Sequence, residues 1–274
     1  MVEKLVTCQW VAEHGNDANV RLVEVDVDTA AYAEGHIRGA AGWNWSTQLQ
    51  DPVRRDVMTK QALEELASAS GVASDTHVVL YGDNSNWFAA YALWVLELYG
   101  HAQASLMDGG RAKWLADGRP VTKEESHPRR TSYRAKDADR AVRARRDDVL
   151  KVVAQGGVQL VDVRSPAEFS GEVIAPPGMS ETAQRGGHIP RALSVPWARA
   201  VNEDGTFKSP AELRALYGAA GLKDGEPVIA YCRIGERSSH TWFVLRHLLG
   251  FKDVRNYDGS WTEYGSLVDV PIEK

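Results

Sequence analysis

The sequence predicts an α/β protein with two tandem domains, each built on a mostly parallel β-sheet flanked by helices. Three observations point to this class. The chain has 274 residues, nearly twice the roughly 150 residues expected for one domain. Two of its segments, 150 positions apart, read alike without a gap. In each half, short apolar runs alternate with longer amphipathic segments, as in the βαβ units of parallel sheets.

The internal repeat sets the domain boundaries that we expect. Residues 77–82 align with residues 227–232. Upstream, residues 22–25 resemble residues 160–163 at a different offset, which places an insertion near residues 171–184 of the second copy. The Pro- and Gly-rich composition of this insertion is typical of a surface loop. We therefore expect an N-terminal domain over residues 1–118, a basic linker over 119–145 and a C-terminal domain over 146–274.

Each copy contains two short apolar runs with the length and β-branched content of buried strands, and the second run leads into a long apolar segment typical of a helix. The predicted strands are residues 21–25, 78–81, 159–163 and 228–231, and the predicted helices are residues 87–99 and 238–249. In open α/β sheets, ligands collect at the carboxyl ends of strands, where helix N-termini also point. Cys232 lies at such a strand end, and Arg237 or Ser238 is the expected N-cap of the helix that follows.

Composition and charge exclude several classes of function. The net charge of −5 offers no overall attraction to nucleic acid, and the 43% hydrophobic fraction is sufficient for folded cores. No stretch approaches the ~18 consecutive apolar residues of a membrane helix, and the N-terminus lacks a signal-peptide core, so we expect a soluble, cytoplasmic protein. The two cysteines, Cys8 and Cys232, are too few for a disulfide framework. The basic linker contains one aromatic residue, Tyr133, which favours a solvated connector over a nucleic-acid site.

Residues 232–239 bring a thiol, a glycine, two arginines and two serines together on one strand-to-helix turn. A thiol at a helix N-terminus, beside Arg233 and Arg237, is expected to favour its nucleophilic thiolate form. Successive backbone N–H groups in such a loop can also hold an anion bonded to the sulfur, and Gly235 permits the backbone angles that this requires. Glu236 opposes the pattern, and we expect it to point outward or to pair with a nearby arginine. The alternative is a buried structural cysteine beside ordinary surface charges.

With this loop and the repeat, the chain resembles the two-domain thiosulfate sulfurtransferases of the rhodanese family over nearly its whole length. Residues 258–261, Asp-Gly-Ser-Trp, and residues 187–189, Gly-His-Ile, also resemble family signatures. The resemblance implies two α/β halves that descend from one duplication, with Cys232 carrying sulfur as a persulfide. It also implies a catalytically silent N-terminal domain, because Gly82 stands where the second copy has its cysteine.

The resemblance further implies roles for the residues around Cys232. Arg164, Arg233 and Arg237 would bind the oxyanion of the substrate. The loop that stabilises the persulfide would consist of Ile234, Gly235, Glu236 and Ser238.

The activity implied by the resemblance is transfer of the sulfane sulfur of thiosulfate, through a Cys232 persulfide, to cyanide or a thiol. Thioredoxin or a sulfur-carrier protein is the candidate acceptor in the cell. The resemblance implies no cofactor. We expect no nucleic-acid or membrane partner, and no metal, because Cys232 lacks a second Cys or His at ligand spacing.

Three alternatives remain open at this point. Relatives that use 3-mercaptopyruvate carry a Gly-Ser-Gly loop after the cysteine, whereas here Arg233 follows it and favours thiosulfate, although Arg237 departs from both patterns. Cysteine phosphatases and arsenate reductases usually place five residues between Cys and Arg, but here residues 233–236 give a shorter loop that encloses less space. A sulfur-carrier module, loaded by a protein donor, is the alternative that is not an enzyme for small donors.

Histidines His36 and His188 each follow a glycine and precede an isoleucine. We expect both to fix turns through ring hydrogen bonds rather than to act in catalysis.

Overall fold

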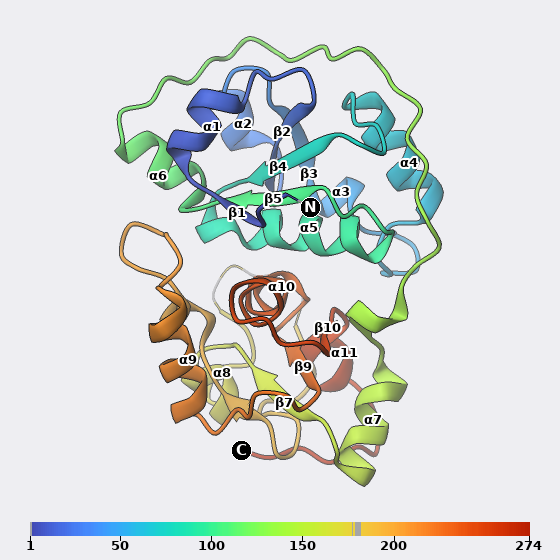
Figure 1. Ribbon diagram of the computed structural model, residues 1–274. Coiled ribbons are helices and arrows are strands. Elements are labelled where there is room, and N and C mark those ends of the chain that lie inside the picture. The colour runs from blue at the N-terminus through green and yellow to red at the C-terminus, as the bar shows by residue number, and fades with distance from the viewer. Residues whose placement is uncertain (1, 177, 179–181) are drawn as a thin grey trace. The chain divides into compact units, whose positions relative to one another are not determined.

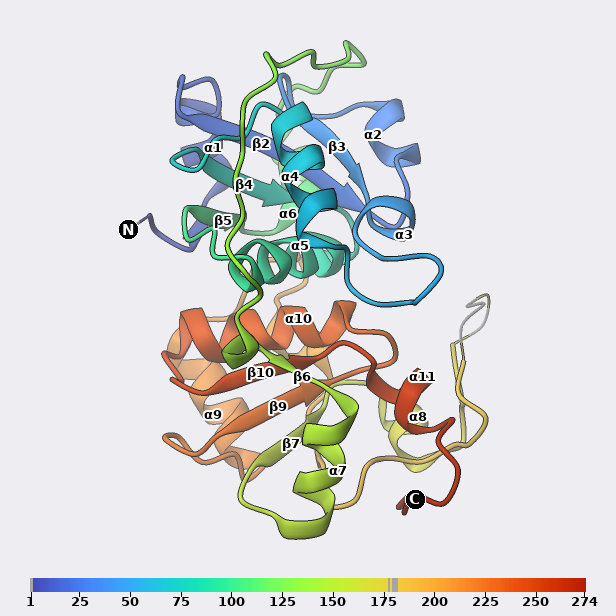
Figure 2. The same ribbon diagram turned by 90° about the vertical axis from the view of Figure 1, so that its right-hand side faces the viewer.

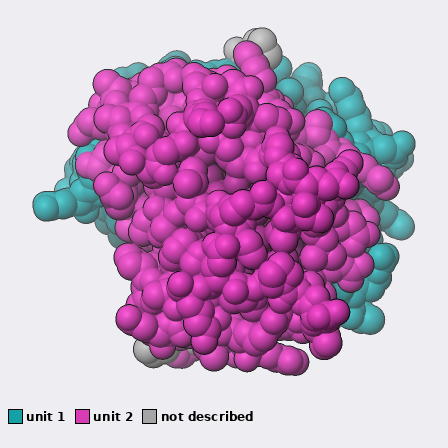
Figure 3. Space-filling model, turned by 90° about the horizontal axis from the view of Figure 1, so that it is seen from below, with its two compact units in different colours: residues 1–139, 202–207 teal, residues 140–201, 208–274 magenta. Residues whose placement is uncertain are grey.

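The computed structural model describes residues 2–176, 178 and 182–274 and divides into two compact units. Unit 1 consists of residues 1–139 and 202–207, and unit 2 consists of residues 140–201 and 208–274 (Figure 3). Residues 119–139 of the expected linker therefore group with unit 1. Residues 140–145 group with unit 2, whose first strand lies among them.

Unit 1 contains a five-stranded, fully parallel sheet in the order β1-β5-β4-β2-β3. Its elements are β1 Leu5–Val6, α1 Cys8–His14, β2 Val20–Asp26, α2 Ala30–Glu34, β3 Ala41–Asn44, α3 Trp45–Gln48, α4 Lys60–Ala69, β4 His77–Tyr81, η1 Asn84–Asn86, α5 Trp87–Leu98, β5 Ala104–Met107 and α6 Gly110–Ala116. Every residue of β4 and β5 is buried, as expected for parallel strands covered on both faces.

Unit 2 repeats this plan with a parallel sheet in the order β6-β10-β9-β7-β8. Its elements are η2 Arg140–Val142, β6 Arg143–Ala144, α7 Arg146–Gln155, β7 Gln159–Asp162, α8 Pro166–Ser170, β8 Leu193–Ser194, η3 Trp197–Ala200, α9 Pro210–Ala219, β9 Val228–Tyr231, α10 Glu236–Phe243, η4 Val244–Leu248, β10 Val254–Tyr257 and α11 Ser260–Tyr264. The two strand orders correspond one to one, so the α/β duplication predicted from the sequence is confirmed.

Helices cover both faces of the sheet in unit 1. On one face, Val11 of α1 and Trp114 of α6 pack in one cluster with Leu22 of β2 and Val79 of β4. Helix α5 contacts β2, β4 and β5 and lies on the opposite face in Figure 1. The residues of these strands therefore point alternately into two apolar layers.

Unit 2 has the same layers. Val149 of α7 and Trp261 of α11 pack with Ile229 and Tyr231 of β9. Helix α10 contacts β9 and β10 and runs along the other face in Figure 2. This packing fixes the first turn of α10 next to the carboxyl end of β9, where Cys232 lies.

Helix α10 begins earlier than the sequence suggested. The expected N-cap at Arg237 or Ser238 is wrong, because the helix starts at Glu236 and its N-cap is Gly235 in a left-handed conformation. The predicted helix over residues 238–249 also changes character at Val244, where a π-helical turn over Val244–Leu248 continues it. A glycine cap has no side-chain oxygen, so the pattern of polar side chains did not reveal the start of this helix.

Turns at His36 and His188 are fixed as expected. The Nδ1 atom of His36 lies 2.9 Å from the carbonyl oxygen of Tyr32, and the Nδ1 atom of His188 lies 2.9 Å from that of Phe169. Each ring also stacks on the aromatic ring of the same partner residue. Each histidine therefore fixes its turn to the short helix that precedes it in the sequence, α2 for His36 and α8 for His188.

The described residues of the insertion over 171–184 form neither helix nor strand, and residues 177 and 179–181 lie outside the described part of the chain. Within the described residues, no helix has both the length and the apolar character needed to cross a membrane.

Helices α8 and α9 begin with the same tetrapeptide, Ser-Pro-Ala-Glu, over residues 165–168 and 209–212. Each forms a capping box, in which the serine accepts from the backbone N–H of the glutamate and the glutamate accepts from the backbone N–H of the serine. The surroundings of the two glutamates differ. Glu212 is exposed, whereas Glu168 is 1% exposed and receives two hydrogen bonds from Arg237 of α10.

This pair of capping boxes gives a matched test of the buried ion pair. Glu168→Ala should lower the free energy of unfolding in urea by about 3–5 kcal/mol, because it leaves the buried Arg237 without its carboxylate. Glu212→Ala, which removes only the cap, should cost about 1 kcal/mol or less. Equal losses for the two variants would show that the ion pair adds nothing beyond the cap.

The pH dependence of the same comparison follows from the pKa of Glu168. Burial alone would raise this pKa, but the hydrogen bonds and the charge of Arg237 hold it below its usual value. Because the pKa of Glu168 is lower in the folded protein than in the unfolded chain, the ionised carboxylate stabilises the protein at pH values above the unfolded pKa of about 4.3. This stabilisation is lost as the pH falls through the pKa of the folded state. The difference between wild type and Glu168→Ala should therefore shrink below about pH 4. A difference that grows on acidification would contradict this account.

Candidate active site

Cys232 follows β9 directly and is fully buried. Its backbone is anchored to the start of α11, because its N–H donates to Ser260 Oγ at 3.0 Å and its carbonyl oxygen accepts from the N–H of Trp261 at 3.1 Å. Ser260 itself has a left-handed backbone with φ of 51°. The expected position of Cys232, at the carboxyl end of its strand, is therefore confirmed, and this strand is the central one of the sheet.

Hydrogen-bond donors surround the sulfur of Cys232. The N–H of Gly235 donates to Sγ at 3.1 Å, and the hydroxyl oxygens of Ser238 and Ser260 lie 3.6 and 4.0 Å from it. Ser238 Oγ also lies 2.6 Å from Oδ1 of Asn256, and one hydroxyl has only one proton to donate. Of these three groups, the backbone amide of Gly235 lies nearest to the sulfur.

The loop requires a glycine at position 235. Its φ is 105°, a region that residues with side chains rarely adopt. A Cβ atom there would also lie 2.9 Å from the Cα atom of Asp258. Asp258 is held in place by Arg143, which donates to its two carboxylate oxygens at 2.8 Å each.

Glu236 lies inside the site. Its side chain is almost fully buried, and the Cys232 thiol donates to its Oε2 atom over 3.4 Å. Its Oε1 atom lies 3.6 Å from Nε of Arg237. Of the two placements expected from the sequence, the outward one is wrong and pairing with an arginine is confirmed.

Arg237 is held by a carboxylate that sequence reasoning missed. Its Nη1 and Nη2 atoms donate to the two oxygens of Glu168 at 2.9 and 3.0 Å, and both side chains are buried. Glu168 also accepts from the backbone and the hydroxyl of Ser165 at 3.0 Å each. The capping box at residues 165–168 was the signal available in the sequence, but it did not reveal the long-range partner.

The expectation of a lowered thiol pKa is wrong for the folded protein. Burial raises the pKa of Cys232, and the charge of Glu236 raises it further, whereas Arg237 and Ser238 lower it. Arg237 has less effect than a free guanidinium would, because the carboxylates of Glu168 and Glu236 already offset its charge.

Arg233 and Ile234 complete the loop, and both are buried. The N–H of Thr262 donates to the carbonyl oxygen of Arg233 at 3.0 Å, so α11 holds this part of the loop as well. The structure thus brings Cys232, Arg233, Ile234, Gly235, Glu236, Arg237 and Ser238 together on one turn.

Arg164, in contrast, forms a buried ion pair with Asp162. Its Nη2 atom donates to Oδ2 of Asp162 at 2.6 Å and to the carbonyl oxygen of Gly187 at 2.7 Å. The guanidinium lies over the ring of Trp261, 4.6 Å from its centroid. These contacts hold the guanidinium in a fixed position, and the substrate-binding role that the resemblance implies for Arg164 stays a prediction.

Unit 1 contains an equivalent ion pair, but its arginine comes from a different position in the sequence. Arg111 of α6 donates to Glu24 at 3.2 Å and to the carbonyl oxygen of Gly35. Glu24 and Gly35 align with Asp162 and Gly187, whereas Arg111 aligns with Trp261 and not with Arg164. Both copies thus bury one guanidinium against the same carboxylate and carbonyl positions, which supports a structural role for Arg164.

In unit 1, a side chain at Gly82, the position aligned with Cys232, would clash with its neighbours. A Cβ atom at Gly82 would lie 2.2 Å from the carbonyl oxygen of Val25 and 2.7 Å from Oδ1 of Asp26. The Gly82 N–H donates to Oδ1 of Asn86 at 3.0 Å. Glycine therefore fits the aligned position in unit 1, where cysteine would not fit without a shift of the surrounding chain.

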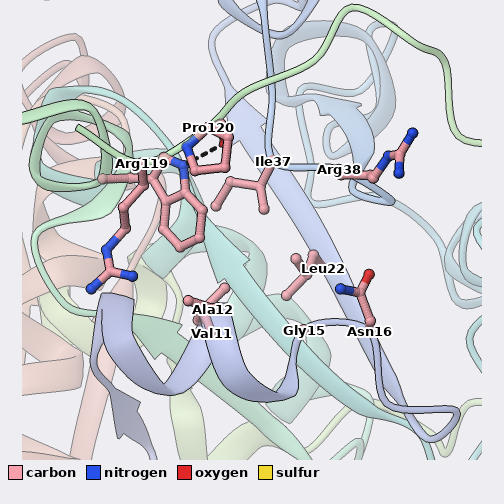
Figure 4. A pocket seen from close by; sticks show the side chains of 10 residues that line it. Val11, Ala12, Gly15, Asn16, Leu22, Ile37, Arg38, Arg119 and Pro120 are labelled. Atoms are coloured by element: carbon pink, nitrogen blue, oxygen red, sulfur yellow. Dashed lines mark hydrogen bonds between the residues drawn. The ribbon is translucent and has the colours of Figure 1, made fainter. Parts of the chain in front are cut away.

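Unit 1 also has a hollow of about 220 Å³ over its core (Figure 4). Trp114, whose Nε1 donates to the carbonyl oxygen of Pro120, is one of the residues that line it. The other lining residues are Val11, Ala12, Gly15, Asn16, Leu22, Ile37, Arg38, Arg119 and Pro120. None of them belongs to the Cys232 loop.

Comparison with known proteins supports the assignment of the fold. The Rhodanese-like domain family matches this chain twice, over residues 7–117 and 146–267. A protein of Saccharopolyspora erythraea named "Putative thiosulfate sulfurtransferase" is 56% identical over 272 residues, covering 99% of this chain and 96% of that protein. The "Sulfur carrier protein TtuD" of Thermus thermophilus is 50% identical over 276 residues, covering 99% and 97%.

Among solved structures, SseA from Escherichia coli, described as a 3-mercaptopyruvate sulfotransferase, superposes with a TM-score of 0.81 at 26% identity. The match covers 95% of this chain and 99% of SseA. The duplicated sheets, the cysteine loop and these matches along nearly the whole length lead to one conclusion: the chain belongs to the rhodanese family of sulfurtransferases.

Proposed function

We propose that this protein is a thiosulfate sulfurtransferase in which Cys232 carries the transferred sulfur as a persulfide. The observation that carries the proposal is the position of the sulfur, which accepts a hydrogen bond from Gly235 at the N-terminus of α10. Backbone N–H groups at a helix N-terminus stabilise an anion on or bonded to that sulfur. The curated relatives named for thiosulfate transfer support the choice of donor.

The first half-reaction is a displacement at sulfur. The Cys232 thiolate attacks the outer sulfur of thiosulfate, a new S–S bond forms, and the bond from that sulfur to the sulfonate sulfur breaks. Sulfite leaves with the bonding electron pair, and the enzyme keeps one additional sulfur atom. The resulting persulfide anion occupies the space next to the Gly235 amide and the Ser238 hydroxyl.

In the second half-reaction, an acceptor nucleophile attacks the terminal sulfur of the persulfide. Cyanide gives thiocyanate, and a thiol gives a new persulfide, while Cys232 leaves as the thiolate. Both half-reactions take place at Cys232, so the cycle needs only one nucleophile in the protein. Thioredoxin or a sulfur-carrier protein is the acceptor that we propose for the cell.

Arg233 and Arg237 supply the positive charge that the dianionic donor requires. Arg237 is positioned for this by Glu168, which fixes its guanidinium in the loop. Because Glu168 and Glu236 already offset much of that charge, the donor relies strongly on the backbone N–H groups and on Arg233.

Two other donors compete with thiosulfate. The likeness to SseA favours 3-mercaptopyruvate, and the relative named as a sulfur carrier favours a protein persulfide. Turnover with thiosulfate, 3-mercaptopyruvate and a persulfide, each with cyanide as acceptor, separates them. We expect the highest kcat/KM with thiosulfate. A value at least ten times higher with either of the others would replace thiosulfate as the donor.

The nucleophile is tested by serine substitution. Cys232→Ser should lower thiosulfate:cyanide turnover by about a thousandfold or more, because a hydroxyl does not form the persulfide. Cys8→Ser is the matched control, since Cys8 is also buried but lies in unit 1, 3.6 Å from the carbonyl oxygen of Asp108. It should retain full turnover. Loss of activity in both variants, or in neither, would contradict the role of Cys232.

The shape of the loop is tested with two glycines of positive φ. Gly235→Ala should reduce kcat/KM by roughly a hundredfold, because the added methyl group meets Asp258 and moves the N–H that stabilises the sulfur. Gly225→Ala has a similar backbone, with φ of 86°, but open space around its Cβ atom. It should cost only about 1 kcal/mol of stability and no activity. Full turnover in Gly235→Ala would show that this N–H is dispensable.

A further inference from the structure

The sulfur of Cys232 is in direct contact with a carboxylate. Glu236 Oε2 lies 3.4 Å from Sγ, and both side chains are buried from solvent. A thiolate and a carboxylate at this distance, away from water, repel each other strongly. The favourable state of the pair therefore contains one proton, which in the folded protein joins the thiol to the carboxylate through the hydrogen bond.

During sulfur transfer, Glu236 would also be repelled by the persulfide on Cys232. The persulfide that we propose is an anion, and it forms in the place of the thiol. If the thiol proton left the site at this stage, the persulfide and the Glu236 carboxylate would be two buried anions in contact. If the proton moves to Glu236 instead, the total charge of the pair stays the same throughout the cycle.

We propose that Glu236 is the proton acceptor of Cys232: it takes the thiol proton when sulfur transfer begins, keeps it while the persulfide exists, and returns it when the sulfur leaves. This inference rests on the proposed function, because it assigns a residue to that reaction. It gives Glu236 a chemical role that accounts for an acidic residue inside an anion-binding loop.

The proton and the electrons balance in each step. The S–H bond of Cys232 breaks, its proton bonds to Oε2 of Glu236, and the electron pair stays on Sγ. This pair attacks the outer sulfur of thiosulfate, and sulfite departs with the electrons of the broken S–S bond. After an acceptor removes the sulfur, the thiolate of Cys232 takes the proton back from Glu236.

The surrounding groups keep this proton between the two side chains. Arg237 faces Oε1 of Glu236 at 3.6 Å but is itself bound to Glu168 of α8 through both of its terminal nitrogens. The loop amide of Gly235 and the hydroxyl of Ser238 face the sulfur side. Arg233 belongs to the same buried turn, and Ser260 of α11 lies 4.0 Å from the sulfur. Oε2 is therefore the oxygen that receives the thiol proton, while Oε1 faces the guanidinium.

Infrared difference spectroscopy tests the proton transfer directly. Wild-type protein is loaded with thiosulfate, and persulfide formation is verified by intact mass in the same sample. The S–H stretch should disappear, and the C=O stretch of a protonated carboxylic acid should appear with it. Glutamate labelled with ¹³C in its side-chain carboxyl group should shift the new band, which assigns it to a glutamate even if no variant is used.

Two variants locate the band. Glu236→Gln lacks the proton acceptor, so it should form persulfide more slowly and without the carboxylic acid band. Glu212→Gln, at an exposed capping glutamate, should retain the band. Persulfide without a carboxylic acid band in the wild type would overturn the role of Glu236 while leaving the proposed function intact. Absence of persulfide in the wild type would instead contradict the proposed function.

Alkylation of the thiol provides a second readout that needs no sulfur donor. The rate of reaction of Cys232 with iodoacetamide, measured against pH in a Cys8→Ser background, reports the apparent pKa of the thiol. Removing the Glu236 charge should lower this pKa by about one unit or more, because the charge raises it in the wild type. Glu212→Gln should leave the profile unchanged. An identical profile for Glu236→Gln would show that the carboxylate does not share the thiol proton.

Discussion

Charge balance in a buried loop is the constraint on which the site depends. The helix N-terminus and two arginines favour an anion at Cys232, but two carboxylates, Glu168 and Glu236, are buried with them. Glu168 has a structural role, because its two hydrogen bonds from Arg237 fix the guanidinium and connect α8 to α10. Burial and the charge of Glu236 raise the pKa of the Cys232 thiol, so activation of this thiol requires an acceptor for its proton.

The duplication shows which parts of the architecture belong to the scaffold and which to the chemistry. Both units bury a guanidinium against the first-strand carboxylate and a glycine carbonyl, through Arg164 in one copy and Arg111 in the other. Because unit 1 retains this pair although Gly82 stands where unit 2 has Cys232, the pair belongs to the fold. What distinguishes unit 2 is the loop after β9, where a thiol replaces the glycine that the crowded backbone of unit 1 requires at Gly82.

Much of this was predictable from the sequence, for identifiable reasons. Strand runs, the repeat offset and the position of Cys232 are local patterns, and the structure agrees with them. The start of α10 escaped prediction because Gly235 caps it through backbone conformation alone. The partner of Arg237 escaped because 69 positions separate it from Glu168, so no local pattern joins them. The direction of the Cys232 pKa shift depended on burial, which the helix N-terminus argument left out.

The central claim is that Cys232 cycles between a thiol and a persulfide, and intact-protein mass spectrometry tests it most directly. After incubation with thiosulfate, the wild-type protein should gain the mass of one sulfur atom and lose it again on addition of cyanide, and Cys232→Ser should show neither change. A wild-type protein that gains no mass, or a serine variant that gains and loses the same mass, would contradict the account.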